Sequence, residues 1–480
     1  MSNRIAALSV FAVTALLSSP AWASPPKFDG SDIGGYMKAL QRSDDPEAKT
    51  ILKQIADGPS DLKRERLLTQ QAGIPLVAPA PNVPADQNAA PLYARWEELR
   101  KQRNVTLPNY AETLNYRYKY TPEQIARVQK IFDDNRDIFD LLHQAADKPS
   151  LAYPLPSGNA DPAGSFPIFA KIREAAREIN TESDLLARAG RYTEAVTNEA
   201  RGFRIAGQLN DQHTLIAYLV AVAIRAIAVS GMRDILYLAG PNEDVGNRVA
   251  AAIRAAEPLS LKDAIAGEVA EETKSVDQMR DAVSRGLSVF DDEGTDAPAE
   301  QAKEQPLTPE QKVFVLNILD ASEARYLAGV RAVVSSAVLP PAERRKRFAQ
   351  LATAHPREES DSQVNPVKSM EAMMLGASTS GDKVDDTLHA REAVTIAAAT
   401  LLAAKARTGA FPASLPDGFT DPFSGKALGY HTEGTDGFVV YSVGPDGKFD
   451  GGKPDRKTKS DQVLFRYPAP AQVPVPKNML

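Results

Sequence analysis

Four aspartates share one glycine-rich stretch near the C-terminus, residues 444–462. Asp446, Asp450, Asp455 and Asp461 supply carboxylate oxygens, and the glycines between them free the backbone to turn its carbonyls inward. Carboxylate and carbonyl oxygens in an irregular arrangement are the ligands that Ca²⁺ prefers. A loop of 19 residues with almost nothing to bury is uncommon and usually functional. The stretch predicts a calcium site; the alternative is a solvated loop whose basic residues neutralise the aspartates.

A second candidate for chemistry is the pair Glu182-Ser183. Helical peptidoglycan lyases use a Glu followed by a Ser as the general acid/base, and this pair resembles that arrangement. A buried Glu suits such chemistry. The Gly-Leu-Met-Gln-type segment that those enzymes carry downstream is missing, however. Residues 180–183 read equally well as a helix-capping stretch, so Glu182 is the single catalytic candidate and the sequence favours a protein without enzymatic activity.

Other catalytic constellations are absent from the sequence. It contains no HExxH, GxxxxGK[ST] or GxSxG motif and no dinucleotide-binding fingerprint. Its histidines are scattered, with no two-His spacing on a helix face, and each is expected to be a surface or packing residue. They are His143, His213, His355, His389 and His431.

The N-terminus has the three parts of a secretion signal. Arg4 supplies a positive charge, residues 5–17 are apolar, and Ala21-Trp22-Ala23 offers a cleavage site before Ser24. The apolar run is too short to span a membrane. We expect a cleaved signal peptide, a periplasmic or secreted protein, and no transmembrane anchor after cleavage.

Composition narrows the partners and the means of stabilisation. The chain has no cysteine, so neither disulfides nor thiolate metal sites can form. Its net charge of −6 argues against a nucleic-acid partner, which would require a basic face. A hydrophobic content of 43% is ordinary for a globular protein.

Proline-rich and polar stretches divide the chain into segments. The expected fold is mainly α, an irregular array of helical hairpins that is weakly tetratricopeptide-like, followed by a small α+β module. We predict these boundaries: 1–23 signal peptide, 24–91 N-terminal segment and Pro-rich spacer, 92–290 helical domain, 291–309 polar linker, 310–383 helix and loose connection, 384–468 α+β module, and 469–480 a Pro-rich tail that frays.

Periodicity and capping residues predict individual helices. Thr121 and Pro122 begin a helix expected to reach His143, and residues 167–188 have helical spacing before a hairpin turn at Gly190. Residues 215–232 are apolar enough to span a membrane. Arg225 near their middle favours a buried core helix instead, since a charge at the centre of a bilayer costs at least about 2.5 kcal/mol.

The C-terminal segment reads as a helix followed by a small antiparallel sheet. An alanine-rich helix is expected over residues 387–408, with Gly409 at its end. Short runs of aromatic and β-branched residues predict strands at 428–432, 437–443 and 463–467.

This segment resembles the globular domain of type II secretion major pseudopilins. The resemblance covers about 80 residues and rests on the alanine-rich helix, FPASL at 411–415, DPFSGK at 421–426 and YSVGPDG at 441–447. It implies calcium ligands at the Val443 backbone carbonyl and the Asp446 and Asp461 carboxylates. Asp450 and Asp455 have no secure counterpart in that family; Asp450 is added to the predicted ligands because of its place in the loop.

The chain also departs from that family. A pseudopilin begins with a methylated apolar helix, whereas this chain begins with a cleavable signal and several hundred helical residues, so the module is borrowed and the protein is not a filament subunit. The helical part is similar to uncharacterised exported bacterial proteins that end in the same module. We expect a non-enzymatic scaffold that binds a protein partner in the cell envelope. The alternatives are a peptidoglycan hydrolase or lyase acting through Glu182, and an accessory component of a type II secretion-like system.

Overall fold

The structure is a computed structural model that describes residues 27, 32–77, 83–108, 114–152, 166–286, 306–354, 365, 367, 381–445, 447–448 and 463–476. The predicted signal peptide and most of the polar linker lie outside these residues. The described chain is mostly helical, with a small C-terminal three-stranded antiparallel sheet. The predicted fold class is therefore confirmed.

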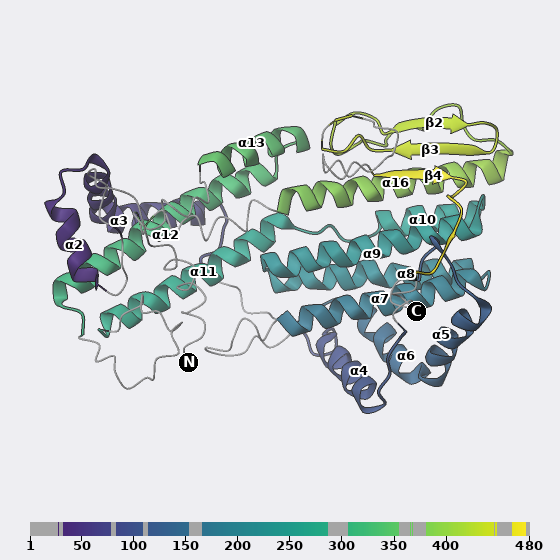
Figure 1. The fold of residues 1–480 in the computed structure, drawn as a ribbon, viewed down its shortest axis with the longest axis horizontal. Helices are drawn as coiled ribbons and strands as arrows, with labels where there is room; N and C mark the ends of the chain where they lie inside the picture. The colour runs from purple at the N-terminus through teal and green to yellow at the C-terminus, as the bar shows by residue number, and fades with distance from the viewer. Residues whose placement is uncertain are drawn as a thin grey trace.

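The helices form an elongated body with two ends (Figure 1). One end holds α2 (Ile33–Arg42), α3 (Pro46–Gln71), α11 (Leu261–Ser284), α12 (Pro309–Ala337) and α13 (Pro341–Ala354). The other holds α4 (Ala90–Gln102), α5 (Pro122–Asp134), α6 (Arg136–Ala146), α7 (Phe166–Arg188), α8 (Tyr192–Gln208), α9 (Leu215–Ala239), α10 (Glu243–Arg254) and α16 (Gly381–Thr408). A 3₁₀ turn, η3 (Leu209–Gln212), joins α8 to α9.

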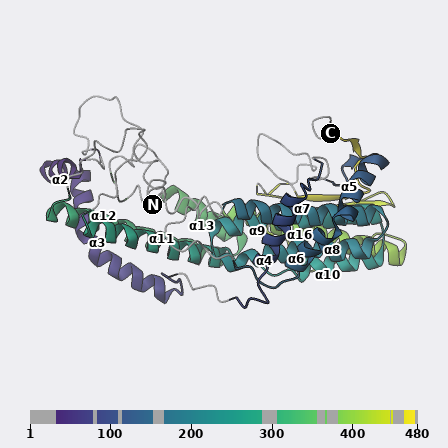
Figure 2. The ribbon, with the colours of Figure 1, turned by 90° about the horizontal axis from the view of Figure 1, so that it is seen from below.

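Residues 24–91, for which no helix was predicted, contribute α2 and α3. Helix α3 packs along α12, more than 200 residues later in the chain (Figure 2). Gly58 allows this approach, because a Cβ there would lie 2.7 Å from the Asn317 carbonyl oxygen. Arg66 then pairs with the fully buried Glu323, its Nε 2.7 Å from the carboxylate. These contacts are non-local, so local periodicity did not reveal them.

The helix predicted over residues 121–143 is two helices. Its start is confirmed: Thr121 and Gln124 form a capping box with Pro122 in the first turn. The predicted continuity is wrong because Asn135 leaves the helical conformation, at φ −126°, and its side-chain amide donates to the Ile131 carbonyl. The break reorients α6, which carries His143 toward α7.

Helices α7, α8 and α9 form consecutive antiparallel hairpins at the centre of the end that also holds α4, α5, α6, α10 and α16, which is the larger of the two ends. The predicted turn is confirmed, with α7 ending at Arg188 and Gly190 at φ +75°, where a glycine is favoured. Helix α9 is the one helix among the described residues that is long and apolar enough to cross a membrane, and 61% of its most apolar window is buried inside the protein. Neighbouring helices α7, α8, α11 and α16 pack around it, as predicted for a core helix.

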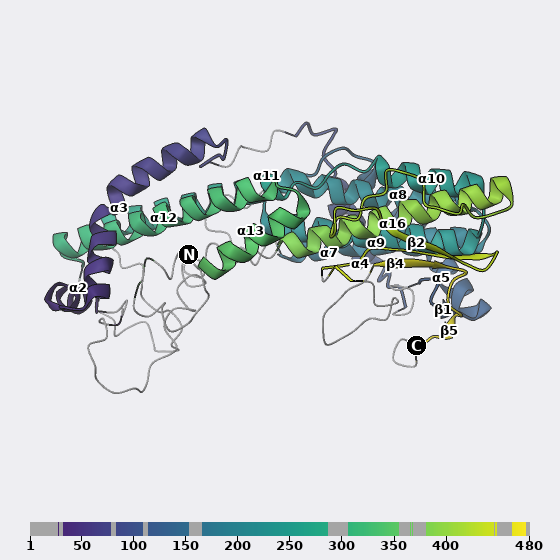
Figure 3. The ribbon, with the colours of Figure 1, turned by 90° about the horizontal axis from the view of Figure 1, so that it is seen from above.

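The C-terminal module consists of α16 and the sheet β2 (Gly429–Glu433), β3 (Gly437–Tyr441) and β4 (Leu464–Tyr467) in the order β2-β3-β4. Helix and strands confirm the prediction, although α16 begins at Gly381, inside the segment expected to be a loose connection. The sheet runs beside α16, which itself packs on α9 and α10 (Figure 3). Phe438 and Phe465 are fully buried between them.

The tail after β4 returns to the helical body. Val473–Pro474 forms β5, which pairs in parallel with β1 (Tyr118–Lys119). The Val473 N–H donates to the Arg117 carbonyl at 3.0 Å, and the Gln472 side chain donates to the Tyr116 carbonyl at 2.7 Å. The prediction that this tail frays is wrong for residues 472–474, because Gln472 and Val473 donate hydrogen bonds to the Tyr116 and Arg117 carbonyls and residues 473–474 pair with β1.

Candidate functional site

The predicted calcium ligands lie mostly outside the described residues. Val443 is described, whereas Asp446, Asp450, Asp455 and Asp461 are not. Within the described part of the chain, no group of three or more His, Asp or Glu side chains could hold a metal ion. The calcium site therefore stays a prediction.

Asp421 organises the base of the loop that carries these aspartates. Its side chain is fully buried and accepts hydrogen bonds from the Ser442 hydroxyl at 2.8 Å and the Val443 N–H at 2.9 Å. It also accepts from the Phe423 N–H at 2.9 Å and the Ser424 hydroxyl at 3.2 Å. With four donors on one carboxylate, Asp421 is a structural anchor that joins the DPFSGK turn to the end of β3. In the sequence, Asp421 stands out only as the first residue of the DPFSGK motif.

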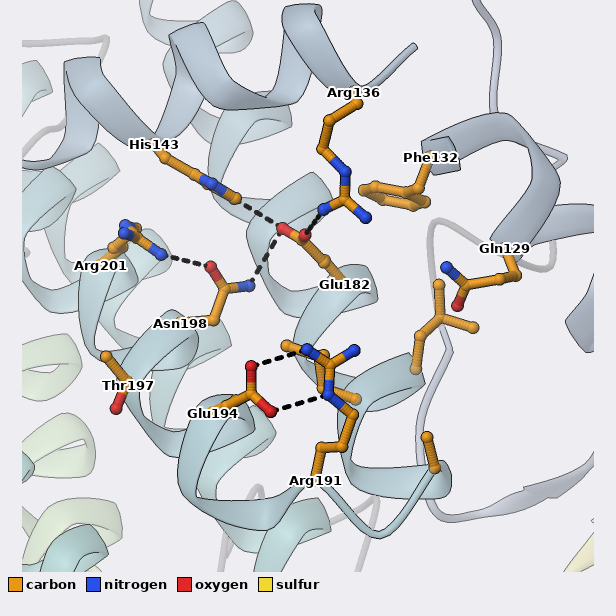
Figure 4. Close-up of a pocket in the computed structure, with 13 residues that line it drawn as sticks. Gln129, Phe132, Arg136, His143, Glu182, Arg191, Glu194, Thr197, Asn198 and Arg201 are labelled. Atoms are coloured by element: carbon orange, nitrogen blue, oxygen red, sulfur yellow. Dashed lines mark hydrogen bonds and ion pairs between the residues drawn. The ribbon is translucent and has the colours of Figure 1, made fainter. Parts of the chain in front are cut away.

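Glu182 lies within α7, well before the helix ends at Arg188. The alternative reading of residues 180–183 as a helix cap is therefore wrong. The side chain is 11% exposed and faces a cavity of about 310 Å³ bounded by α5, α6, α7 and α8 (Figure 4). The cavity is lined by Gln129, Phe132, Arg136, His143, Glu182, Leu185, Leu186, Ala189, Arg191, Glu194, Thr197, Asn198 and Arg201.

Three side chains contact the Glu182 carboxylate. His143 Nε2 lies 2.6 Å from Oε2, and the Asn198 amide donates to the same oxygen at 3.3 Å. Arg136 approaches Oε1 at 3.5 Å. The expectation that His143 is only a surface or packing residue is wrong, because it pairs with Glu182. His143 and Glu182 are 39 positions apart in the chain and lie on different helices, so the sequence alone did not indicate that they form a pair.

The groups around Glu182 are themselves held in place. Arg201 donates to the Asn198 side-chain oxygen at 2.8 Å. The Ser183 hydroxyl donates to the Ile179 carbonyl at 2.9 Å and accepts from Asn198 at 3.2 Å. Ser183 is thus engaged inside the helix pair and does not line the cavity.

Neither a family model, nor a curated protein, nor a solved structure matches this chain.

The cavity can therefore be judged by its chemistry alone. The only hydroxyl among its lining side chains belongs to Thr197, which donates to the Thr193 carbonyl at 2.9 Å. The lining side chains include no Ser, Cys or Lys that could serve as a nucleophile beside the His143–Glu182 pair. Arginine, imidazole and amide groups dominate, and these groups suit the binding of a polar ligand.

A separate group of carboxyls lies buried between α7, α8 and α9. Burial raises the pKa of the Glu199 carboxyl to about 8; the hydrogen bond from the Asn180 amide opposes the rise, and the neighbouring Asp234 adds to it. Burial likewise raises the pKa of Asp234 to about 7, with the charge of Asp184 adding to the effect. Gly231 makes room for Glu199, since a Cβ there would lie 2.4 Å from its carboxyl carbon. These groups do not line the cavity.

Proposed function

We propose that this protein is an exported, non-enzymatic interaction protein of the bacterial cell envelope, with a calcium-stabilised C-terminal module. The observation that carries the non-enzymatic part is the environment of Glu182. Its carboxylate is contacted by His143, Asn198 and Arg136, and the cavity-lining residues include no Ser, Cys or Lys. A general acid directs its proton at a substrate atom, whereas Oε2 of Glu182 is engaged by protein groups, His143 and Asn198.

The interaction role is supported by the shape of the body and by the predicted export. Elongated arrays of helical hairpins offer extended surfaces to protein partners. Helix α16 of the C-terminal module packs on α9 and α10, and β5 pairs with β1, so the C-terminal segment is fixed to the helical body. The N-terminal sequence pattern supports delivery to the periplasm or beyond.

The calcium part makes a prediction about stability. Adding calcium to the full-length protein should raise its melting temperature, because an ion that binds only the folded state at a hundredfold excess over its Kd stabilises by about 2.7 kcal/mol. Asp446→Ala and Asp461→Ala should each abolish the rise. Differential scanning calorimetry with calcium, magnesium and a chelator measures it.

Asp417→Ala is the matched control, because Asp417 is exposed and lies outside the loop. This variant should retain the full calcium response. An equal shift with magnesium, or no change on chelation, would contradict the calcium proposal.

A second function, peptidoglycan cleavage through Glu182, is favoured by one observation: this Glu is nearly buried and faces a cavity. The two functions differ in a measurable product. A lyase or hydrolase releases soluble muropeptides from purified cell wall, and the proposed interaction protein does not.

A further inference from the structure

The cavity at Glu182 is lined by charged side chains of both signs. Three arginines line it against two glutamates; of the three, Arg201 is paired with Asp147, which lies outside the lining. Arg136 and Arg191 approach from opposite sides of Glu182, the first from the start of α6 and the second from the turn between α7 and α8 (Figure 4). Guanidinium groups in such positions bind carboxylates with paired, charge-assisted hydrogen bonds.

The two arginines retain the capacity to accept a ligand. Their side chains are 56% and 55% exposed. Arg191 uses Nε and one terminal nitrogen on Glu194, at 2.7 and 2.6 Å, and Arg136 makes only longer contacts, at 3.5 Å to Glu182 and 3.6 Å to Asp133. Each guanidinium carries five N–H groups, so donors remain on both.

Glu182 adds an acceptor at the centre of the cavity. Its Oε2 is engaged by His143 and Asn198, while among the described residues Oε1 has only the 3.5 Å contact to Arg136, at the outer limit of a hydrogen bond. Oε1 can therefore accept from a ligand hydroxyl or amino group. The network of His143, Asn198 and Arg201 holds the carboxylate in that position.

The apolar lining and the volume of the cavity suit a small organic ligand. Phe132, Leu185 and Leu186 line the cavity together with these polar groups. Its volume of about 310 Å³ lies at the small end of ligand pockets. A compact organic molecule fits such a space.

We infer that the cavity at Glu182 binds a small carboxylate that carries a hydroxyl or amino group: the carboxylate between Arg136 and Arg191, the hydroxyl or amine on Glu182 Oε1. The inference adds a ligand to the non-catalytic role of Glu182 proposed above and so rests on that role. It does not depend on calcium or on the C-terminal module.

Calorimetric titration of the purified full-length protein tests the inference with two matched pairs of probes. D-Glucuronate and D-glucose differ by the carboxylate, and L-glutamate and glutarate differ by the amine. At least one of the acidic, donor-bearing probes should bind, and its matched partner should bind at least tenfold more weakly. Which probe binds distinguishes a sugar acid from an amino acid.

Variants locate the site of binding. Arg136→Gln and Arg191→Gln should each weaken binding by about tenfold or more, as expected for the loss of one charge-assisted contact. Arg285→Gln, an exposed arginine on the other end of the body, is the control and should leave binding unchanged. Melting temperatures confirm that each variant folds.

Two outcomes would overturn the inference. The first is that neither D-glucuronate nor L-glutamate binds at 10 mM. The second is binding that Arg136→Gln and Arg191→Gln leave unchanged. Neither outcome would contradict the proposed function of a non-enzymatic interaction protein. Conversely, if Glu182-dependent release of muropeptides were found, the proposed function would fail while the titration would still report whether a small acid binds.

Discussion

Replacing Arg225 by methionine should lower the free energy of unfolding by about 3–5 kcal/mol. Arg225 lies in the middle of α9 and is 6% exposed. It forms an ion pair with Glu392 on α16, and its Nη1 donates to the Glu257 carbonyl at 2.6 Å. Removing the guanidinium breaks the buried ion pair with Glu392 and the hydrogen bond to the Glu257 carbonyl, which costs far more than the loss of an exposed ion pair.

A double-mutant cycle separates this effect from simple loss of packing. Arg225→Met with Glu392→Met should recover most of the lost stability, since two apolar side chains of similar volume can replace a buried ion pair at little cost. Arg248→Met removes an exposed pair with Asp244 and should change the stability very little. If the double variant is no more stable than the single one in urea titrations, the pair does not explain the effect.

The same pair explains why so apolar a helix belongs to the core. Helix α9 presents apolar side chains to α7, α8 and α11, and its one central charge meets a partner on α16. The ion pair therefore joins the C-terminal module to the central helix of the larger end.

Replacing Glu199 by glutamine should remove a large pH dependence of stability. The pKa of Glu199 is raised from 4.5 to about 8 in the folded protein, so between these values the folded state holds a proton that the unfolded state has lost. Stability therefore falls as pH rises through this window, by up to about 1.4 kcal/mol per pH unit from this group. Glutamine keeps the shape of the protonated carboxyl and cannot ionise.

Urea unfolding of both proteins at intervals from pH 5 to pH 8 measures the difference. The wild type should lose stability relative to Glu199→Gln as pH rises. Asp234 continues to titrate in the variant, so some slope remains. Glu194→Gln is the control: Glu194 is exposed and its pKa is lowered by Arg191, so it cannot account for stability lost at alkaline pH. Parallel pH profiles for wild type and Glu199→Gln would contradict a buried neutral carboxyl.

Local patterns predicted the local structure well. The capping box at Thr121, the glycine turn at Gly190 and the three C-terminal strands each depend on a few neighbouring residues, and the structure confirms them. Helix α3 was missed because its interior contains Gly58 and Pro59, which are poor helix formers, and its stability comes from packing on α12.

The candidate site shows the same division. Glu182 was singled out from its type and its helical context, but the groups that decide its chemistry lie on other elements: His143 on α6 and Asn198 on α8. The role of Asp421 likewise depends on Ser442 and Val443, about twenty residues away. Such pairings follow from tertiary packing, which a single sequence does not display.

Incubation of the purified protein with purified peptidoglycan tests the central claim most directly, with Glu182→Gln as the paired variant. Glutamine preserves the acceptor toward Asn198 and cannot donate a proton as an acid. We expect no soluble muropeptides above background from either protein, with equal melting temperatures. Release by the wild type that disappears in the folded Glu182→Gln variant would show that Glu182 is a catalytic acid and contradict the proposed function.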